Sequence, residues 1–210
     1  METPRLRGVL HLITAPIAIV GGLVLVALAG TVSGRISLAV FTVTSALLFS
    51  GSAIYHIGNW SPRTKQMLRR LDHSNIFLII AGTYTPLSIM LLNADDARRL
   101  LAFVWTGALL GVGIHNFWAS APRGIYVPIY IALGWAAVAY LPQFATASAV
   151  VLGLLIAGGV LYTLGALVYA FKWPSLSPTW FGFHELFHAF TVLAFAAHFT
   201  AISVTLAQVS

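Results

Sequence analysis

The sequence contains no cysteine, and charged side chains make up only 8% of its 210 residues. The lack of cysteine excludes disulfides, thiolate metal sites and cysteine nucleophiles, so any metal must be held by His, Asp or Glu. A soluble domain normally carries about 25% charged residues, which cover its surface. Because this chain is 59% hydrophobic, we expect it to be solvated by lipid instead.

Seven apolar segments are long enough to cross a bilayer, which takes about 20 residues per helix. They cover residues 9–30, 35–57, 71–92, 100–118, 124–141, 148–171 and 183–206. The first run faintly resembles a cleavable signal, but it is longer than the apolar core of one, so we expect it to be retained. The sequence therefore predicts an all-α polytopic membrane protein, a seven-transmembrane helix bundle that forms a single domain over residues 1–210.

The net charge of +6 comes from 11 basic and 5 acidic residues. In a soluble protein this balance would suggest nucleic acid, but here the basic residues lie in short loops, which indicates membrane topology and no nucleic-acid partner. The side of the N-terminus and of loops two, four and six carries Arg5, Arg7, Arg63, Lys65, Arg69, Arg70, Arg123 and Lys172. The other side carries Arg35, Arg98 and Arg99. We therefore expect a cytoplasmic N-terminus and an outer C-terminus.

Ionisable residues inside a membrane are costly and mark functional sites by default. His56 ends the second run, and Asp72 begins the third. His184 and His188 begin the seventh. Because these runs alternate in direction, all four residues are expected at one depth, near the cytoplasmic face.

The spacing of His184 and His188 places both side chains on one face of a helix. Two such imidazoles can bind one Zn²⁺, and His56 could supply a third nitrogen. Three protein ligands with an open water position form a catalytic zinc geometry, in which Asp72 could bind or orient the water. Unrelated interfacial histidines are the alternative. Haem is disfavoured because no histidine pair stands out on facing helices at mid-membrane.

Two residues on the same helical faces extend this candidate site. Ser52 lies four residues before His56 and could donate a hydrogen bond to the water or to a substrate carbonyl, or it could simply pack helices together. His198 lies ten residues past His188, about 15 Å deeper. It either lines the same cavity or bonds a neighbouring helix. The remaining intramembrane histidines are expected to be structural: His11 and His115.

The segment His184–His188 also matches H-E-x-x-H, the signature of zinc metalloproteases, in which Glu185 would be the general base. Such a protease needs an acidic third ligand, and the sequence after His188 offers no good candidate. His73 is about 100° round the helix from Asp72, so we expect it to face elsewhere.

Three blocks of sequence carry a family resemblance: Ser52-Ala-Ile-Tyr-His56, Leu71-Asp72-His73-Ser-Asn-Ile76 running to Ala81-Gly-Thr-Tyr-Thr-Pro86, and His184-Glu-Leu-Phe-His188 running to His198-Phe199. Together with the seven runs, they resemble the hemolysin III family, the bacterial branch of the progestin and adipoQ receptor superfamily. The resemblance extends over nearly the whole chain and implies a protein of the bacterial plasma membrane.

The resemblance implies a zinc ion held by His56, His184 and His188, with Asp72 acting through a water on the metal and Ser52 as its partner. It implies kinship with adiponectin receptors and with alkaline ceramidases, which cleave lipid amides. Glu185 departs from the receptors, in which a neutral residue is usual. The leading hypothesis is therefore a zinc-dependent lipid amide hydrolase whose substrate is a membrane lipid.

Other classes of function stay open. The zinc could be a structural staple in a non-enzymatic or receptor-like protein that senses or adjusts membrane fluidity or energetics. The family name suggests haemolysis, although spanning helices are inserted at synthesis rather than secreted. An intramembrane metalloprotease is a further alternative. The sequence predicts no particular protein partner.

Overall fold

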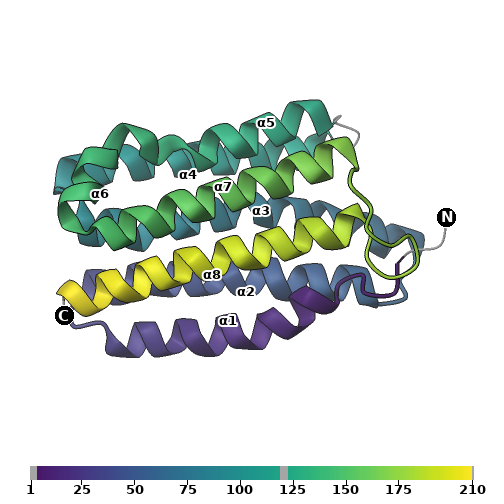
Figure 1. Cartoon of the computed structure of the whole chain (residues 1–210), viewed down its shortest axis with the longest axis horizontal. Helices are drawn as coiled ribbons and strands as arrows, with labels where there is room; N and C mark the ends of the chain where they lie inside the picture. The colour runs from purple at the N-terminus through teal and green to yellow at the C-terminus, as the bar shows by residue number, and fades with distance from the viewer. Residues whose placement is uncertain (1–3, 119–122, 210) are drawn as a thin grey trace.

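The computed structural model describes residues 4–118 and 123–209, which fold into helices that run side by side (Figure 1). In this part of the chain, seven helical segments are long and apolar enough to cross a membrane, so the predicted seven-helix membrane bundle is confirmed. The elements are α1 (Val9–Leu28), α2 (Val32–Ile57), α3 (Pro62–Leu91), α4 (Ala94–Phe117), α5 (Arg123–Gly134), η1 (Ala136–Tyr140), α6 (Leu141–Ala147), α7 (Ala149–Phe171) and α8 (Phe183–Val209).

The helices pack in chain order and the last helix closes the bundle. Each of α1, α2 and α3 packs against the helix that follows it, and α7 packs against α8. Helix α8 also contacts α1 and α3, so its side chains reach the middle of the molecule. The last turn of α2 and the first turn of α8 lie at the end of the bundle where the α7–α8 loop is found (Figure 1). We call this the histidine end.

The surface of the bundle is apolar, and several of its buried hydroxyls donate to carbonyls of their own helix. Large side chains such as Ile17, Phe103 and Leu110 are more than 60% exposed. Inside, the hydroxyl of Thr42 donates to a carbonyl one turn earlier in its own helix, at 2.7 Å. The hydroxyl of Thr85 does the same, at 2.8 Å. This pattern suits a protein solvated by hydrocarbon, which cannot hydrogen bond to a polar group.

Helix α3 begins at Pro62, well before the expected residue 71. The hydroxyl of Ser61 caps it by accepting a hydrogen bond from the backbone N–H of Thr64, and Pro62 suits the first helical position because it has no N–H to satisfy. The expected boundary considered apolar length alone, and a capped helix continues past the hydrocarbon. Asp72 therefore lies inside α3 and not at its start.

The fifth span is broken into α5, η1 and α6, although the sequence predicted one helix over 124–141. At the break, the hydroxyl of Tyr84 on α3 donates to the carbonyl of Gly134, at 2.6 Å. The same hydroxyl accepts from the backbone N–H of Ala137, at 3.0 Å. A side chain of a neighbouring helix thus satisfies backbone groups that the break sets free, which is the condition for irregular backbone within a membrane.

Candidate metal centre

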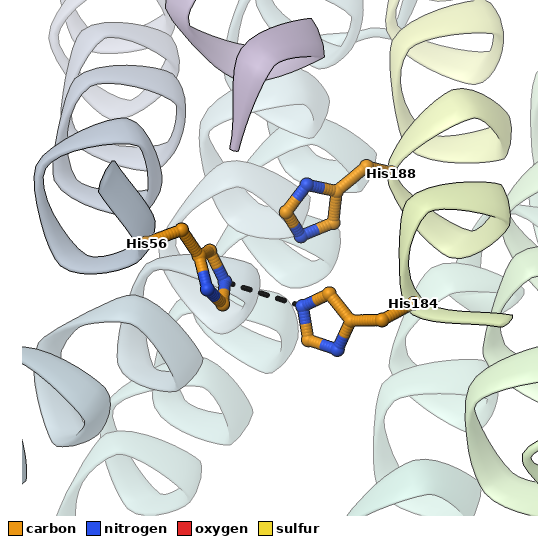
Figure 2. Close-up of side chains that lie close together, drawn as sticks. All are labelled: His56, His184 and His188. Carbon is orange, nitrogen blue, oxygen red and sulfur yellow. Dashed lines mark hydrogen bonds between the residues drawn. The ribbon is translucent and has the colours of Figure 1, made fainter. Parts of the chain in front are cut away.

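Three histidines from two helices converge at the histidine end. His56 lies in the last turn of α2, and His184 and His188 lie in the first two turns of α8 (Figure 2). Each offers one ring nitrogen, and these three atoms lie within 4.8 Å of one another. The four-residue spacing on α8 points both of its imidazoles at His56.

The geometry of this three-histidine cluster fits a zinc ion. Zinc binds imidazole nitrogens at about 2.0–2.1 Å in a tetrahedral arrangement, which separates two such nitrogens by about 3.4 Å. The Nε2 atoms of His56 and His184 are 3.2 Å apart. His188 is 2% exposed, so its ring is held inside the protein and away from bulk water. The described residues therefore contain a group of three histidines that could hold a metal ion.

A carboxylate from a third helix faces the same point. Oδ2 of Asp72 on α3 lies 3.8 Å from Nε2 of His56, the nitrogen that also faces His184. The carboxylate therefore approaches the cluster on the side of His56, from the nitrogen that His56 turns toward His184. The hydroxyl of Ser52, which is 1% exposed, donates a hydrogen bond to the Asp72 side chain. The structure thus brings together both residues that the sequence singled out for catalysis.

His11 is a neighbour of this cluster that the sequence analysis assigned to a structural role. Its ring stacks on that of His188, with centroids 3.9 Å apart and planes 5° from parallel. Parallel rings at this distance cannot both point a nitrogen at one ion, so His11 supports the orientation of His188. The signal was present in the sequence, because His11 begins a run at the same membrane face as Asp72 and His188. The sequence alone therefore places His11 at the same membrane depth as Asp72 and His188.

Glu185, the acidic residue of the H-E-x-x-H pattern, is bound by residues outside the three-histidine cluster. Its buried carboxylate pairs with Arg7. It also accepts a hydrogen bond from the backbone N–H of Gly182, at 2.8 Å. The segment before α1 is held to the α7–α8 loop as well, since the N–H of Arg5 donates to the carbonyl of Thr179, at 2.9 Å. Both oxygens of Glu185 thus have structural partners, which disfavours the metalloprotease hypothesis.

His73 belongs to a second polar group beside the cluster, as its helical phase predicted. Its Nε2 lies 3.0 Å from the hydroxyl of Tyr169, and its Nδ1 lies 2.7 Å from the carbonyl of Arg69. Its ring also contacts His115, with centroids 4.8 Å apart. His73 therefore lies next to the three-histidine cluster without sharing its centre.

A largely apolar inner cavity begins at the cluster and runs into the bundle. It occupies about 140 Å³, roughly ten times the 10–15 Å³ needed for one water. It extends along α8 from His188 to His198, a distance of about 15 Å at 1.5 Å per residue. His198 lines this cavity, and its Nε2 also lies 3.3 Å from the carbonyl of Leu155 on α7. Both alternatives considered for His198 therefore apply together.

A second, wider hollow lies on the outer side of the cluster. We call it the vestibule; it measures about 1570 Å³ and is lined by polar side chains of the loops and helix ends. His56 and His184 of the cluster line it, and so do His73 and His115 of the second polar group. The cluster thus lies between an open polar hollow and a narrow apolar cavity.

Comparison with known proteins agrees with this architecture. Residues 1–199 match the family described as haemolysin-III related. The Hemolysin-3 of Bacillus cereus is 33% identical over 164 residues, which cover 78% of this chain and 72% of that protein. The Hemolysin-3 homolog of Bacillus subtilis (strain 168) is 31% identical over 168 residues, which cover 80% of this chain and 76% of that protein. The family resemblance noted in the sequence is confirmed, and the chain belongs to the hemolysin III family as an integral, multi-pass membrane protein.

Proposed function

We propose that this protein is a zinc-dependent hydrolase that cleaves lipid amide bonds from within the membrane. The observation that carries the proposal is the position of Asp72. Its carboxylate lies 3.8 Å from Nε2 of His56, one of the three histidines of the donor set, and it lines the apolar cavity that begins there. A structural metal site needs no carboxylate at this place and no cavity behind it.

The donor set favours zinc as the metal. Imidazole nitrogens suit zinc, copper, iron and nickel, and zinc commonly takes three protein ligands while leaving a position open in hydrolytic sites. The ligands would be His56, His184 and His188. When bound there, zinc would polarise the amide carbonyl and make water a better nucleophile near neutral pH.

The side chains of this protein supply the proton transfers. Asp72 acts as general base: it takes a proton from the attacking water and returns it to the leaving amine. Ser52 donates its single hydroxyl proton to Asp72, and so orients the carboxylate in the resting state. When that hydroxyl turns toward the substrate, it can stabilise the negative charge that develops on the carbonyl oxygen. The inner cavity receives the acyl chain and keeps bulk water out.

A structural zinc is the second candidate, because the ligands come from both α2 and α8. A metal there would tie the two helices together at the histidine end. The same cluster would then serve a protein that adjusts membrane properties without turnover. The two candidates differ in whether Asp72 is needed for anything besides packing.

The test compares wild type with His188→Ala, Asp72→Asn and His115→Ala, each purified in lipid nanodiscs. Zinc is measured by mass spectrometry, and fatty-acid release is followed over a panel of ceramides and other N-acyl lipids. We expect His188→Ala to lose zinc and the control His115→Ala to keep it. Asp72→Asn should keep zinc while turnover falls by about 10²- to 10⁴-fold.

Two results would contradict the proposal in different ways. Equal zinc in wild type and His188→Ala would remove the metal site. Full zinc in wild type without cleavage of any lipid amide in the panel would remove the hydrolase and leave the structural staple.

A further inference from the structure

The vestibule outside the three-histidine cluster is lined by cationic side chains. These are Arg5, Arg7, Lys65, Arg69 and Lys172. No Asp or Glu is found among the described residues that line it. Arg7 is neutralised by Glu185, but within the described ranges the other four form no ion pair. Four positive charges are thus gathered around one hollow, and among the described residues none of the four is paired with a carboxylate.

Membrane topology alone does not explain where these charges lie. Lys65 and Arg69 are four residues apart on α3, so they share the helical face that lines the vestibule. Like charges at this spacing destabilise a helix. Arg63 and Arg70 lie on the same segment of α3 and add positive charge to the same side of the membrane, yet neither lines the vestibule. The positive-inside rule requires charge on one side of the membrane, but not on one face of a helix.

The order of the hollows matches the order of groups in a lipid. The apolar inner cavity, the three-histidine cluster and the cationic vestibule follow one another from the interior of the bundle to its end. An N-acyl lipid has an acyl chain, an amide and a polar headgroup in the same order. Arginine and lysine are the side chains that proteins use to bind phosphate.

We propose that the vestibule binds a phosphate group, carried as the headgroup of the lipid whose amide lies at the cluster. The placement of the amide rests on the proposed hydrolase function, whereas the phosphate site rests on the vestibule alone. Lys65 and Arg69 would contact the phosphate from α3, with Arg5 contributing from the segment before α1 and Lys172 from the end of α7. Lipids with neutral headgroups would leave these four cations unpaired.

The test measures binding to the full chain in nanodiscs of phosphatidylcholine, by microscale thermophoresis. Three probes are compared: lysophosphatidic acid, a monoacylglycerol with the same acyl chain, and inorganic phosphate. We expect lysophosphatidic acid to bind at least about tenfold more tightly than the monoacylglycerol, which corresponds to one good hydrogen bond to a charged group. Inorganic phosphate should compete weakly, because it has no chain for the inner cavity.

Two double variants remove equal charge from the same helix. Lys65→Gln with Arg69→Gln should abolish the preference for the phosphate lipid. Arg63→Gln with Arg70→Gln should keep it, and equal melting temperatures show that both variants fold. Equal binding of the charged and neutral lipids by wild type, or equal loss in both double variants, would overturn the proposal. Inorganic phosphate that binds as tightly as lysophosphatidic acid would overturn its assignment to a lipid headgroup.

Binding is read without turnover, so this proposal and the hydrolase fail separately. Selective binding of lysophosphatidic acid without amide cleavage would refute the hydrolase and keep the phosphate site. Amide cleavage with equal kcat/KM for phosphate-bearing and neutral lipids would keep the hydrolase and refute the phosphate site.

Discussion

The imidazoles of His11 and His188 stack face to face, with centroids 3.9 Å apart, and so join the start of α1 to the candidate metal ligands on α8. The edge of the same His11 ring meets Phe49, at 5.1 Å between centroids. Neither nitrogen of His11 has a hydrogen-bond partner among the described residues. The orientation of His188 is therefore supported by ring packing from a helix that supplies no ligand itself.

Replacing His11 should weaken metal binding without removing a ligand. Groups that orient a metal-binding imidazole typically contribute 10- to 100-fold in affinity, so we expect His11→Ala to lower zinc affinity by about tenfold. His11→Phe should lose less, because it keeps a flat ring against His188. Zinc retention against graded concentrations of a chelator measures the effect. Wild-type retention in His11→Ala would show that the stack does not support the site.

Ser52→Ala should slow turnover and leave the metal content unchanged. It removes the hydrogen bond that orients Asp72, and a bond to a charged group corresponds to about 10- to 100-fold in rate. Ser45→Ala is the matched control, since Ser45 is equally buried on α2 but donates to the carbonyl of Phe41. Initial rates of fatty-acid release give the comparison. The role of Ser52 is refuted if both variants slow turnover equally.

Breaking the ion pair of Arg7 and Glu185 should destabilise the fold strongly. Arg7→Met leaves the carboxylate of Glu185, which is 1% exposed, without a charged partner, and such a loss costs about 3–5 kcal/mol. Arg7→Met combined with Glu185→Leu should recover much of the free energy of unfolding, because no buried charge remains. Thermal unfolding in detergent, followed by tryptophan fluorescence, reports the change. A loss no larger than that of Arg5→Met, at an exposed residue of the same segment, would refute the importance of the pair.

Two glycines of α7 should respond oppositely to alanine. A Cβ at Gly158 would press on the ring of His198 and so disturb the far end of the inner cavity, whereas a Cβ at Gly153 would meet nothing within 4 Å. Gly153→Ala should stabilise the protein by about 0.5–1 kcal/mol, because alanine loses less backbone entropy in a helix. Gly158→Ala should lower the melting temperature and slow the cleavage of long-chain substrates. Similar melting shifts for the two variants would contradict the close approach of α7 and α8.

The existence of the seven spans followed from the sequence because it depends on a local property. A helix in hydrocarbon must satisfy its own backbone and present apolar side chains, and both requirements can be judged one segment at a time. The depth of His56, Asp72 and the His184–His188 pair followed as well, because alternating spans return to the same face. Family membership followed from the motifs in the same segments.

Other features depended on contacts that apolar length does not encode. The early start of α3 comes from the cap at Ser61, and the break in the fifth span is supported by Tyr84, about 50 residues earlier in the chain. The helical phase of Asp72 predicted a separation from His73 but not the contact of Asp72 with Ser52. These features arise from the rotation of each helix about its axis, which packing decides.

The sequence by itself determined the membrane environment, the number of spans and the depth at which the histidines gather. Only the tertiary structure decided that three imidazoles converge with a carboxylate beside one of them, that His11 stacks behind His188, and that Glu185 is bound to Arg7. The physical reason is that depth is set by the length of apolar chain, one segment at a time. The direction in which each side chain points is set by how side chains from distant segments pack against one another, and that packing exists only when the bundle is assembled.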